Sequence, residues 1–299
     1  MKSRPGGPVE EVGRSPLPSV PADRGPTAAS SSATSRPGAV ARYPVTLTRI
    51  LQLFAAESAA GRTMFDAACG QGESSNALQA LGFEVTCTTF VRSPKLNPGI
   101  RCLEDVDLNL ELPVADASFD CASLQEVFEH LENPAHVVRE FNRILKPGGL
   151  WGMTAPNGSC LRSRLHFLLS GFVKGRWRAA DYNNPPGNYK NLFIPSLPML
   201  HYLTWQYGFR IERTGRSRRS LASVMLYVLL WPLIRLRTRR FTHPLKRFDT
   251  PLQRKACADL RRWLLSPHVL LDENLVLLLR KRHGIEGLYD PGRPRPDAD

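Results

Sequence analysis

The stretch TMFDAACGQGES, residues 63–74, combines residue types that could do chemistry with a spacing that would bring them to one ligand. A short apolar run ends at Asp66, and the chain then turns through Gly70 and Gly72 into a polar helix start. Because glycine has no Cβ, its backbone can approach a bound molecule closely, and the first amides of a helix attract polar groups. The pattern predicts a ligand-binding turn that follows a strand.

Two common nucleotide-binding motifs do not fit this turn. A phosphate-binding loop requires G-x-x-x-x-G-K-[ST], and no lysine follows these glycines at that spacing. A dinucleotide fingerprint requires a third glycine where this chain has Ser75. An acid at the end of the first strand also favours a ligand with a cationic amino group over a pyrophosphate, which Asp66 would repel.

The elements that must position this turn alternate between strand and helix. Such alternation with short glycine-rich joints predicts an α/β fold with a doubly wound, mostly parallel sheet and helices on both faces, in which ligands bind at the carboxyl ends of the strands. The predicted strands are 63–67, 83–88, 100–104, 119–124, 150–155, 209–214 and 274–279, and the predicted helices are 74–81, 136–145, one that begins near residue 45 and stops at Gly61, and one before Gly208.

Two parts of the chain resemble the class I S-adenosylmethionine-dependent methyltransferases. FDAACGQGES is similar to the first motif of that family. The longer block DVDLNLELPVADASFDCASLQEVFEHLENPAHVVREFNRILKPGGLWGMTAPN is similar to its middle part, from the third strand to the fifth. The resemblance covers about residues 62–157 and implies a Rossmann-like fold, methyltransferase activity and S-adenosylmethionine as the methyl donor.

The resemblance also implies which residues hold the donor. They are Asp66, Ala68, Gly70 and Gly72 for its methionine and ribose portions, Asp107 and Leu108 for adenine, and Gln125 with Glu126 at its floor. One position departs from the family pattern, because the acid expected after the second strand is replaced by Thr88 and Thr89. A threonine hydroxyl at the ribose makes a weaker bond than a carboxylate. Either the donor affinity is reduced or the alignment of the second strand is shifted.

The segment QEVFEHLENP lies where an acceptor would meet the methyl group. We assign catalytic roles to His130, as a general base or positioning group, and to Glu126 beside it. Related ubiquinone-biosynthesis O-methyltransferases use a similar E-x-x-E-H arrangement with a divalent cation, but many relatives with the same letters need none. We therefore predict no metal, and Glu129 remains an alternative capping residue.

The chain divides into a tail and one domain. Residues 1–42 are rich in Pro, Ser, Gly and Ala and predict a disordered tail, whereas 43–299 form the methyltransferase domain. Within it, residues 158–200 predict an insertion after the fifth strand that covers the acceptor, the alternative being a plain surface helix and loop. Residues 218–270 predict a basic and apolar helical segment.

That last segment contains LASVMLYVLLWPLI, residues 221–234, followed at once by RLRTRR. Fourteen apolar residues are fewer than the about 20 that span a bilayer, and Pro232 interrupts the run. An apolar helix next to arginines could lie on an anionic membrane surface. We prefer a helix buried in the core or in an oligomer interface.

The charge is uneven along the chain. Of the net +13, the part from His201 onward carries 20 Lys and Arg against 9 Asp and Glu, a net +11. This asymmetry favours an anionic partner such as a membrane surface, although no nucleic-acid-binding module is present and we do not expect nucleic acid.

The six cysteines stand far apart, and the first residues have no apolar segment. These features predict a cytoplasmic protein with free thiols, at most peripheral to a membrane.

Three functions remain open from the sequence. The first is a methyltransferase acting on a small-molecule, glycan or lipid-linked acceptor. The second is a catalytically silent module of the same fold, suggested by the missing ribose acid. The third is a nucleic-acid methyltransferase, which is disfavoured because NNPPGNY at 183–189 lies beyond the fifth strand, too late to serve as an amino-methylation motif.

Overall fold

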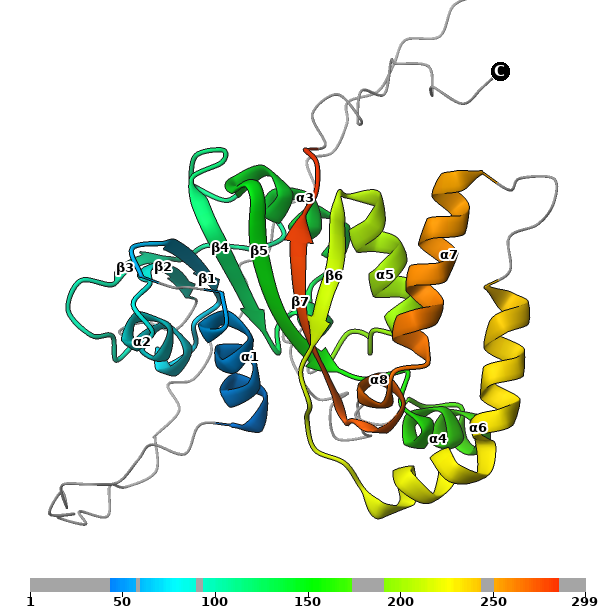
Figure 1. Cartoon of the computed structure of the whole chain (residues 1–299). Helices are drawn as coiled ribbons and strands as arrows, with labels where there is room; N and C mark the ends of the chain where they lie inside the picture. Colours follow the sequence, from blue (N-terminus) through cyan, green and yellow to red (C-terminus); the bar gives the residue numbers. More distant parts are fainter. Residues whose placement is uncertain (1–43, 58–59, 90–93, 174–190, 243–249, 285–299) are drawn as a thin grey trace, which may run out of the picture. The chain divides into compact units, whose positions relative to one another are not determined.

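The structure is a computed structural model that describes residues 44–57, 60–89, 94–173, 191–242 and 250–284. These residues build one seven-stranded sheet in the order β3-β2-β1-β4-β5-β7-β6 (Figure 1). The strands are β1 Thr63–Ala67, β2 Glu84–Thr89, β3 Arg101–Glu104, β4 Phe119–Gln125, β5 Leu145–Pro156, β6 Phe209–Thr214 and β7 Asn274–Lys281.

The first five strands are parallel, and β7 reverses the direction. It pairs antiparallel with β5, from Leu150 opposite Arg280 to Pro156 opposite Asn274, and antiparallel with β6. The ends of β1 and β4 lie together, with Ala67 opposite Leu124. The prediction of a mostly parallel, doubly wound sheet is confirmed, and the carboxyl ends of the central strands meet at one edge.

The two faces of the sheet carry separate hydrophobic clusters. Neighbouring residues of β1 point to opposite faces, so that Met64 packs with one cluster and Phe65 with the other. One cluster contains α1 Val45–Ala55 and α2 Glu73–Ala80. The other contains α3 Pro134–Ile144 and α5 Leu197–Gln206. The predicted helices on both faces are confirmed.

Local signals explain where these helices begin. The side chain of Asn133 accepts a hydrogen bond from His136 N at the start of α3, and Ser196 accepts one from Met199 N at the start of α5. A proline follows each cap in the first turn, where its missing N–H is not needed. Helix α1 ends at Ala55, six residues before the predicted stop at Gly61.

The segment Lys146–Gly149 differs from the prediction. It was expected to separate a helix from a strand, but β5 already begins at Leu145, directly after α3. The pairing of β4 with β5 shifts its register between Phe119 and Cys121, and Gly148 has a φ of +78°. The extra residues are therefore accommodated as an irregularity inside the strand pairing.

The remaining helices follow β4, β5 and β6. They are a 3-10 turn η1 Phe128–His130, α4 Leu161–Ser170, α6 Leu221–Phe241, α7 Pro251–Leu264 and α8 Pro267–Leu271. Buried Asp272 ties this region together, because its carboxylate accepts from Ser217 N at 2.8 Å and from the Arg219 guanidinium. The predicted tail 1–42 lies outside the described residues.

Candidate functional site

A cavity of about 340 Å³ lies at the carboxyl edge of the sheet. Four segments line it: the amino end of α1, the turn after β1, the first residues of α2, and Gln125 and Glu126 at the end of β4. We call this cavity the donor cleft. The topology places it where parallel α/β sheets bind their ligands, because the loops after neighbouring strands diverge there and leave a gap.

Asp66 forms the buried polar end of the donor cleft. Its side chain is 1% exposed and accepts hydrogen bonds from Ser75 Oγ at 2.7 Å and from Ser74 Oγ at 3.2 Å. Burial disfavours the charged form and raises the pKa of the Asp66 carboxyl to about 6, although the hydroxyl bonds oppose this shift. Among the described residues, those that bond Asp66 carry no positive charge. A cationic amino group would therefore complement the ionised carboxylate.

The turn after β1 brings bare backbone to the donor cleft. Ala68, Gly70 and Gly72 have φ values of +56°, +57° and +95°, a region that favours glycine. A Cβ on Gly70 would meet no atom within 4 Å, whereas a Cβ on Gly72 would lie 2.8 Å from the carbonyl oxygen of Lys95. Gly70 therefore leaves space free at the cavity, and Gly72 permits close packing of the loop at 94–99.

Glu126 enters the donor cleft from the end of β4. Its φ of +54° is unusual for a residue with a side chain. Thr154 holds its backbone, since Glu126 N donates to the Thr154 carbonyl oxygen at 3.0 Å, and Asn274 Nδ2 donates to its carboxylate oxygens at 3.2 and 3.3 Å. Burial raises the pKa of the Glu126 carboxyl. A strained, hydrogen-bonded carboxylate at a cavity is typical of a functional position.

Comparison with known proteins places a family match on a part of the chain that lines the donor cleft. Residues 65–151 match a family model described as a methyltransferase domain. This segment contains the turn, β4 and most of β5. The chain carries a class I S-adenosylmethionine-dependent methyltransferase domain.

Curated relatives of this methyltransferase domain align over about 100 residues. The ubiquinone biosynthesis O-methyltransferase of Chromobacterium violaceum is 31% identical over 103 residues, which cover 31% of this chain and 43% of that protein. A Mycolicibacterium smegmatis protein named "Probable S-adenosylmethionine-dependent methyltransferase" is 32% identical over 108 residues, covering 34% of this chain and 41% of that protein. The match spans about two fifths of the length of these curated relatives.

A solved structure of an S-adenosylmethionine-dependent methyltransferase from Archaeoglobus fulgidus is also similar. It shows 14% identity and a TM-score of 0.46, and the alignment covers 77% of this chain and 94% of that chain.

Five of the residues predicted for the methyltransferase site line the donor cleft. They are Asp66, Ala68, Gly70, Gln125 and Glu126. Gly72, Thr88, Asp107, Leu108 and His130 are not among the lining residues. Gln125 Nε2 donates to Ser74 Oγ at 2.6 Å, which connects the end of β4 to the hydroxyl that bonds Asp66.

Thr88 supports the turn from the neighbouring strand. Its Oγ1 accepts from Ala68 N at 2.9 Å, and its carbonyl oxygen accepts from Cys69 N at 2.8 Å. The side chain is 1% exposed. The sequence did not predict this structural task, and contact of Thr88 with the ribose stays a prediction.

Asp107 organises the loop after β3. Its Oδ1 accepts from Asn109 N at 2.8 Å and from Asn109 Nδ2 at 3.0 Å, and Asn109 Oδ1 in turn accepts from Glu132 N and Asn133 N. Leu108 is buried in the core. These bonds are typical of an acid that stabilises a turn, and the adenine contact stays a prediction.

The structure separates the two residues predicted to be catalytic. Glu126 lines the donor cleft, whereas His130 lies on η1 with 40% of its side chain exposed. Between them, Glu129 is buried, and its Oε2 has no hydrogen-bond partner among the described residues. Burial raises the pKa of the Glu129 carboxyl to about 7, and the nearby Glu126 charge adds to this shift. The Glu129 carbonyl oxygen accepts from Leu192 N at 2.8 Å, so it also fixes the chain before α5.

The potential metal ligands that lie close together are not the Glu126, Glu129 and His130 set. Within the ranges that the structure describes, the one group of three close ligand atoms consists of the thiols of Cys69, Cys87 and Cys102, whose sulfur atoms all lie within 4.8 Å of one another. These cysteines stand far apart in the sequence but occupy the turn after β1 and the adjacent β2 and β3. The pKa of the Cys69 thiol is lowered by the hydrogen bond from Cys87, whereas burial raises that of Cys102.

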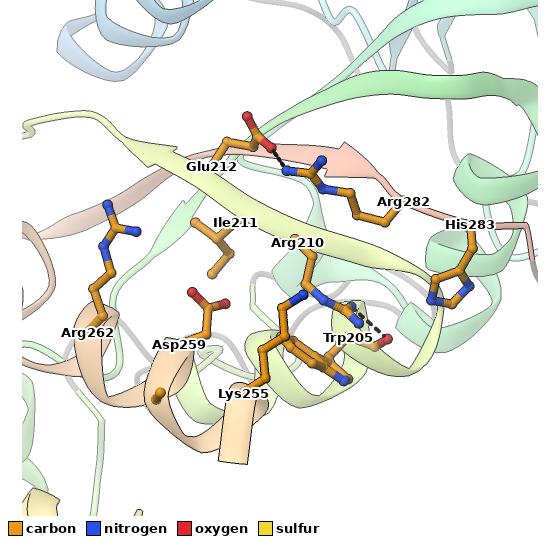
Figure 2. Close-up of a pocket in the computed structure, with 10 residues that line it drawn as sticks. Trp205, Arg210, Ile211, Glu212, Lys255, Asp259, Arg262, Arg282 and His283 are labelled. Atoms are coloured by element: carbon orange, nitrogen blue, oxygen red, sulfur yellow. Dashed lines mark hydrogen bonds and ion pairs between the residues drawn. The ribbon is translucent and has the colours of Figure 1, made fainter. Parts of the chain in front are cut away.

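A larger hollow of about 830 Å³ lies away from the donor cleft (Figure 2). It contains Arg210 near the start of β6 and Arg282 just after β7. Because β6 runs parallel to β5 and β7 runs opposite, both positions belong to the amino-terminal edge of the sheet. The Arg210 guanidinium stacks on Trp205 at 3.2 Å from the ring centroid, and Arg282 pairs with Glu212. The hollow is therefore not part of the donor site.

Sequence reasoning missed several residues that line the cleft or bond its carboxylates. Ser74 and Ser75 follow Asp66 by eight and nine positions, and this offset is the signal that could have identified them as partners of the acid. No local signal identifies Pro44, Thr46 or Asn274, because folding brings them from distant segments. The predicted acceptor cover at 158–200 is only partly described, since Lys174, Arg176, Trp177, Arg178, Tyr182 and Tyr189 lie outside the described residues.

Proposed function

We propose that this protein transfers a methyl group from S-adenosylmethionine to an oxygen of a small-molecule or lipid-linked acceptor. The observation that carries the proposal is the buried Asp66 carboxylate beside an open glycine turn, with Glu126 in the same cavity. A relative named an O-methyltransferase supports oxygen as the methylated atom.

The residues of the cleft have separate tasks in this proposal. Asp66, fixed by Ser74 and Ser75, binds the donor amino group. The backbone around Gly70 gives the donor room to approach. The donor supplies an already activated methyl group when bound, so the protein must mainly align the acceptor and exclude water.

Glu126 acts on the acceptor. Its carboxylate is held by Asn274, and its raised pKa makes it a better proton acceptor than an ordinary glutamate. As the new oxygen–carbon bond forms and the donor's carbon–sulfur bond breaks, the hydroxyl proton moves to a Glu126 oxygen. His130 is too exposed to be our first choice as base.

The first test is calorimetric titration of the full chain with S-adenosylmethionine and with S-adenosylhomocysteine. We expect both to bind. Absence of heat and of a ligand-induced shift in thermal unfolding would favour the catalytically silent module instead.

The second test concerns turnover. Comparing metabolites and lipids of a deletion strain with those of its parent should reveal the acceptor as an unmethylated precursor. With that acceptor, Glu126→Gln should lower kcat by about a hundredfold or more while donor binding remains. Glu132→Gln, an exposed acid on the loop after η1, is the matched control and should leave kcat unchanged. Equal kcat in wild type and Glu126→Gln would exclude this base.

A further inference from the structure

Helix α6 exposes most of its apolar side chains. It runs over 21 residues and continues through Pro232, so the predicted interruption at that residue is wrong. The preference for a helix buried in the core is wrong as well, because Ser223 alone is buried in α6. Burial of α6 in an oligomer interface stays a prediction. Its exposed large apolar residues are Leu221, Val224, Met225, Val228, Leu229, Leu233, Leu236 and Phe241, of which Leu221 and Phe241 are each 85% exposed.

Helix α4 extends this apolar area. Figure 1 shows α4 beside α6, and residues of the two helices are in contact. Exposed apolar residues on α4 and directly after it are Leu165, Phe167, Leu168, Leu169 and Phe172. We call these two sets together the α4–α6 surface. So many exposed large apolar side chains on neighbouring helices mark an interaction surface, since soluble proteins rarely leave large apolar patches in water.

The charges on these helices all have one sign. Neither Leu161–Ser170 nor Leu221–Phe241 contains an acidic residue. The carboxyl half of α6 carries Arg235, Arg237, Arg239 and Arg240, all exposed. A second copy of this chain would bring the same positive charge to the contact, which disfavours self-association. An apolar face next to arginines fits the headgroup region of an anionic bilayer, where lipid phosphates and carboxylates are the counter-ions.

The neighbours of α6 favour an orientation in the plane of the bilayer. By length and composition α6 could cross a membrane, and it is the one such helix among the described segments. However, it contacts α4, α7 and α8, and its four arginines occupy the last seven residues. Crossing would break the contacts with the domain and move these charges into hydrocarbon, which is costly.

We propose that the α4–α6 surface binds the interface of an anionic lipid bilayer. The apolar side chains enter the headgroup and acyl boundary, and the arginines meet the anionic lipids. Helix α4 begins five residues after β5 ends, at the sheet edge that holds the donor cleft. Membrane binding would therefore bring that edge toward amphiphilic acceptors. This consequence rests on the proposed function, but lipid binding itself does not.

The test is sedimentation of the full chain with vesicles of phosphatidylcholine alone or mixed with phosphatidylserine. We expect binding to the mixed vesicles that falls as salt rises. A variant with Arg235→Gln, Arg237→Gln, Arg239→Gln and Arg240→Gln should bind them about a hundredfold more weakly. A matched control with Arg254→Gln, Lys255→Gln, Arg261→Gln and Arg262→Gln on α7 removes the same charge and should bind much better than the α6 variant.

A second variant tests the apolar part. Leu168→Ser, Leu169→Ser, Val228→Ser and Leu229→Ser change exposed residues, so folding should survive and vesicle binding should be lost. Equal binding by the α6 arginine variant and wild type, or equal loss in the α7 control, would overturn the proposal. The proposal would also be overturned if the wild type binds no vesicles but forms a dimer, and the serine variant is a monomer. Donor binding by calorimetry should be unchanged in every variant, which separates this test from that of the proposed function.

Discussion

The donor cleft and the α4–α6 surface place their side chains in opposite surroundings. In the cleft, the charged Asp66 is 1% exposed and surrounded by hydroxyl donors. On α6, the apolar Leu221 is 85% exposed. Burying a charge and exposing apolar area both cost free energy unless a partner compensates. In our two proposals the compensating partner is a cationic ligand for the cleft and a lipid surface for the α4–α6 surface.

The largest expected effect separates the two glycines of the turn. Gly70→Val should weaken donor binding by about a hundredfold or more, because its side chain would extend into open space at the cleft. The positive φ adds roughly 1–2 kcal/mol of strain to the fold. Gly72→Ala is the comparison variant, since its Cβ would collide with the Lys95 carbonyl and lower stability first. Calorimetry and thermal unfolding measure both quantities, and unchanged donor affinity in Gly70→Val would contradict the assignment.

The second prediction compares a buried leucine with an exposed one. Leu200→Ala in α5 should lower the free energy of unfolding by about 2–5 kcal/mol, because Leu200 is fully buried in the core. Leu229→Ala in α6, 75% exposed, should change it by less than about 0.5 kcal/mol. Denaturant unfolding without vesicles measures both. A large loss at Leu229 would mean that α6 packs as a core helix in solution.

The third prediction tests the charge of Asp66. Asp66→Asn keeps the shape of the side chain and removes the carboxylate charge, so donor binding should weaken by about 2 kcal/mol, roughly thirtyfold. Asp120→Asn is the matched control, since Asp120 lies at the amino end of β4, away from the donor cleft, and bonds Thr63 and Lys146. That control should lose stability but keep donor affinity. Equal affinity in wild type and Asp66→Asn would leave the amino group without its proposed partner.

The smallest effect is a pH dependence of donor binding. The pKa of Asp66 is about 6 in the free protein, so the carboxyl is mostly ionised at pH 7 and mostly protonated at pH 5. Only the ionised form attracts a cationic amino group. Donor affinity should therefore fall by about tenfold as the pH drops over this range. Calorimetry at several pH values measures the slope, and Asp66→Asn should show a flat profile.

Most of the sheet could be predicted because its signals are local. The bounds of β1 and β6 agree with the sequence prediction, since an apolar run, its turn residues and a following glycine lie within a few positions. The beginning of β5 could not be predicted. Pro147 and two glycines argue against a strand there, and only pairing with β4 keeps Leu145 in the sheet.

The site followed the same division. Asp66, Gly70, Gln125 and Glu126, which the family resemblance implied, line one cavity because they belong to two compact motifs at the ends of neighbouring strands. His130 belongs to one of these motifs, but its side chain is exposed on η1. The backbone of that turn sets where the side chain points, and the sequence motif does not specify it. Asn274, which holds Glu126, lies 148 residues further along the chain. Sequence spacing carries no information about such a contact.

The sequence by itself determined the glycine turn, the order of strands and helices, and the basic charge of the last third. These properties depend on backbone freedom, hydrophobic periodicity and composition, which neighbouring residues define. The tertiary structure alone decided that α6 is exposed, that three distant cysteines meet, and that Glu126 rather than His130 enters the cleft. Hydropathy measures how favourable burial of a helix would be. Burial also requires another element to pack against that helix, and only the tertiary structure shows where such elements lie.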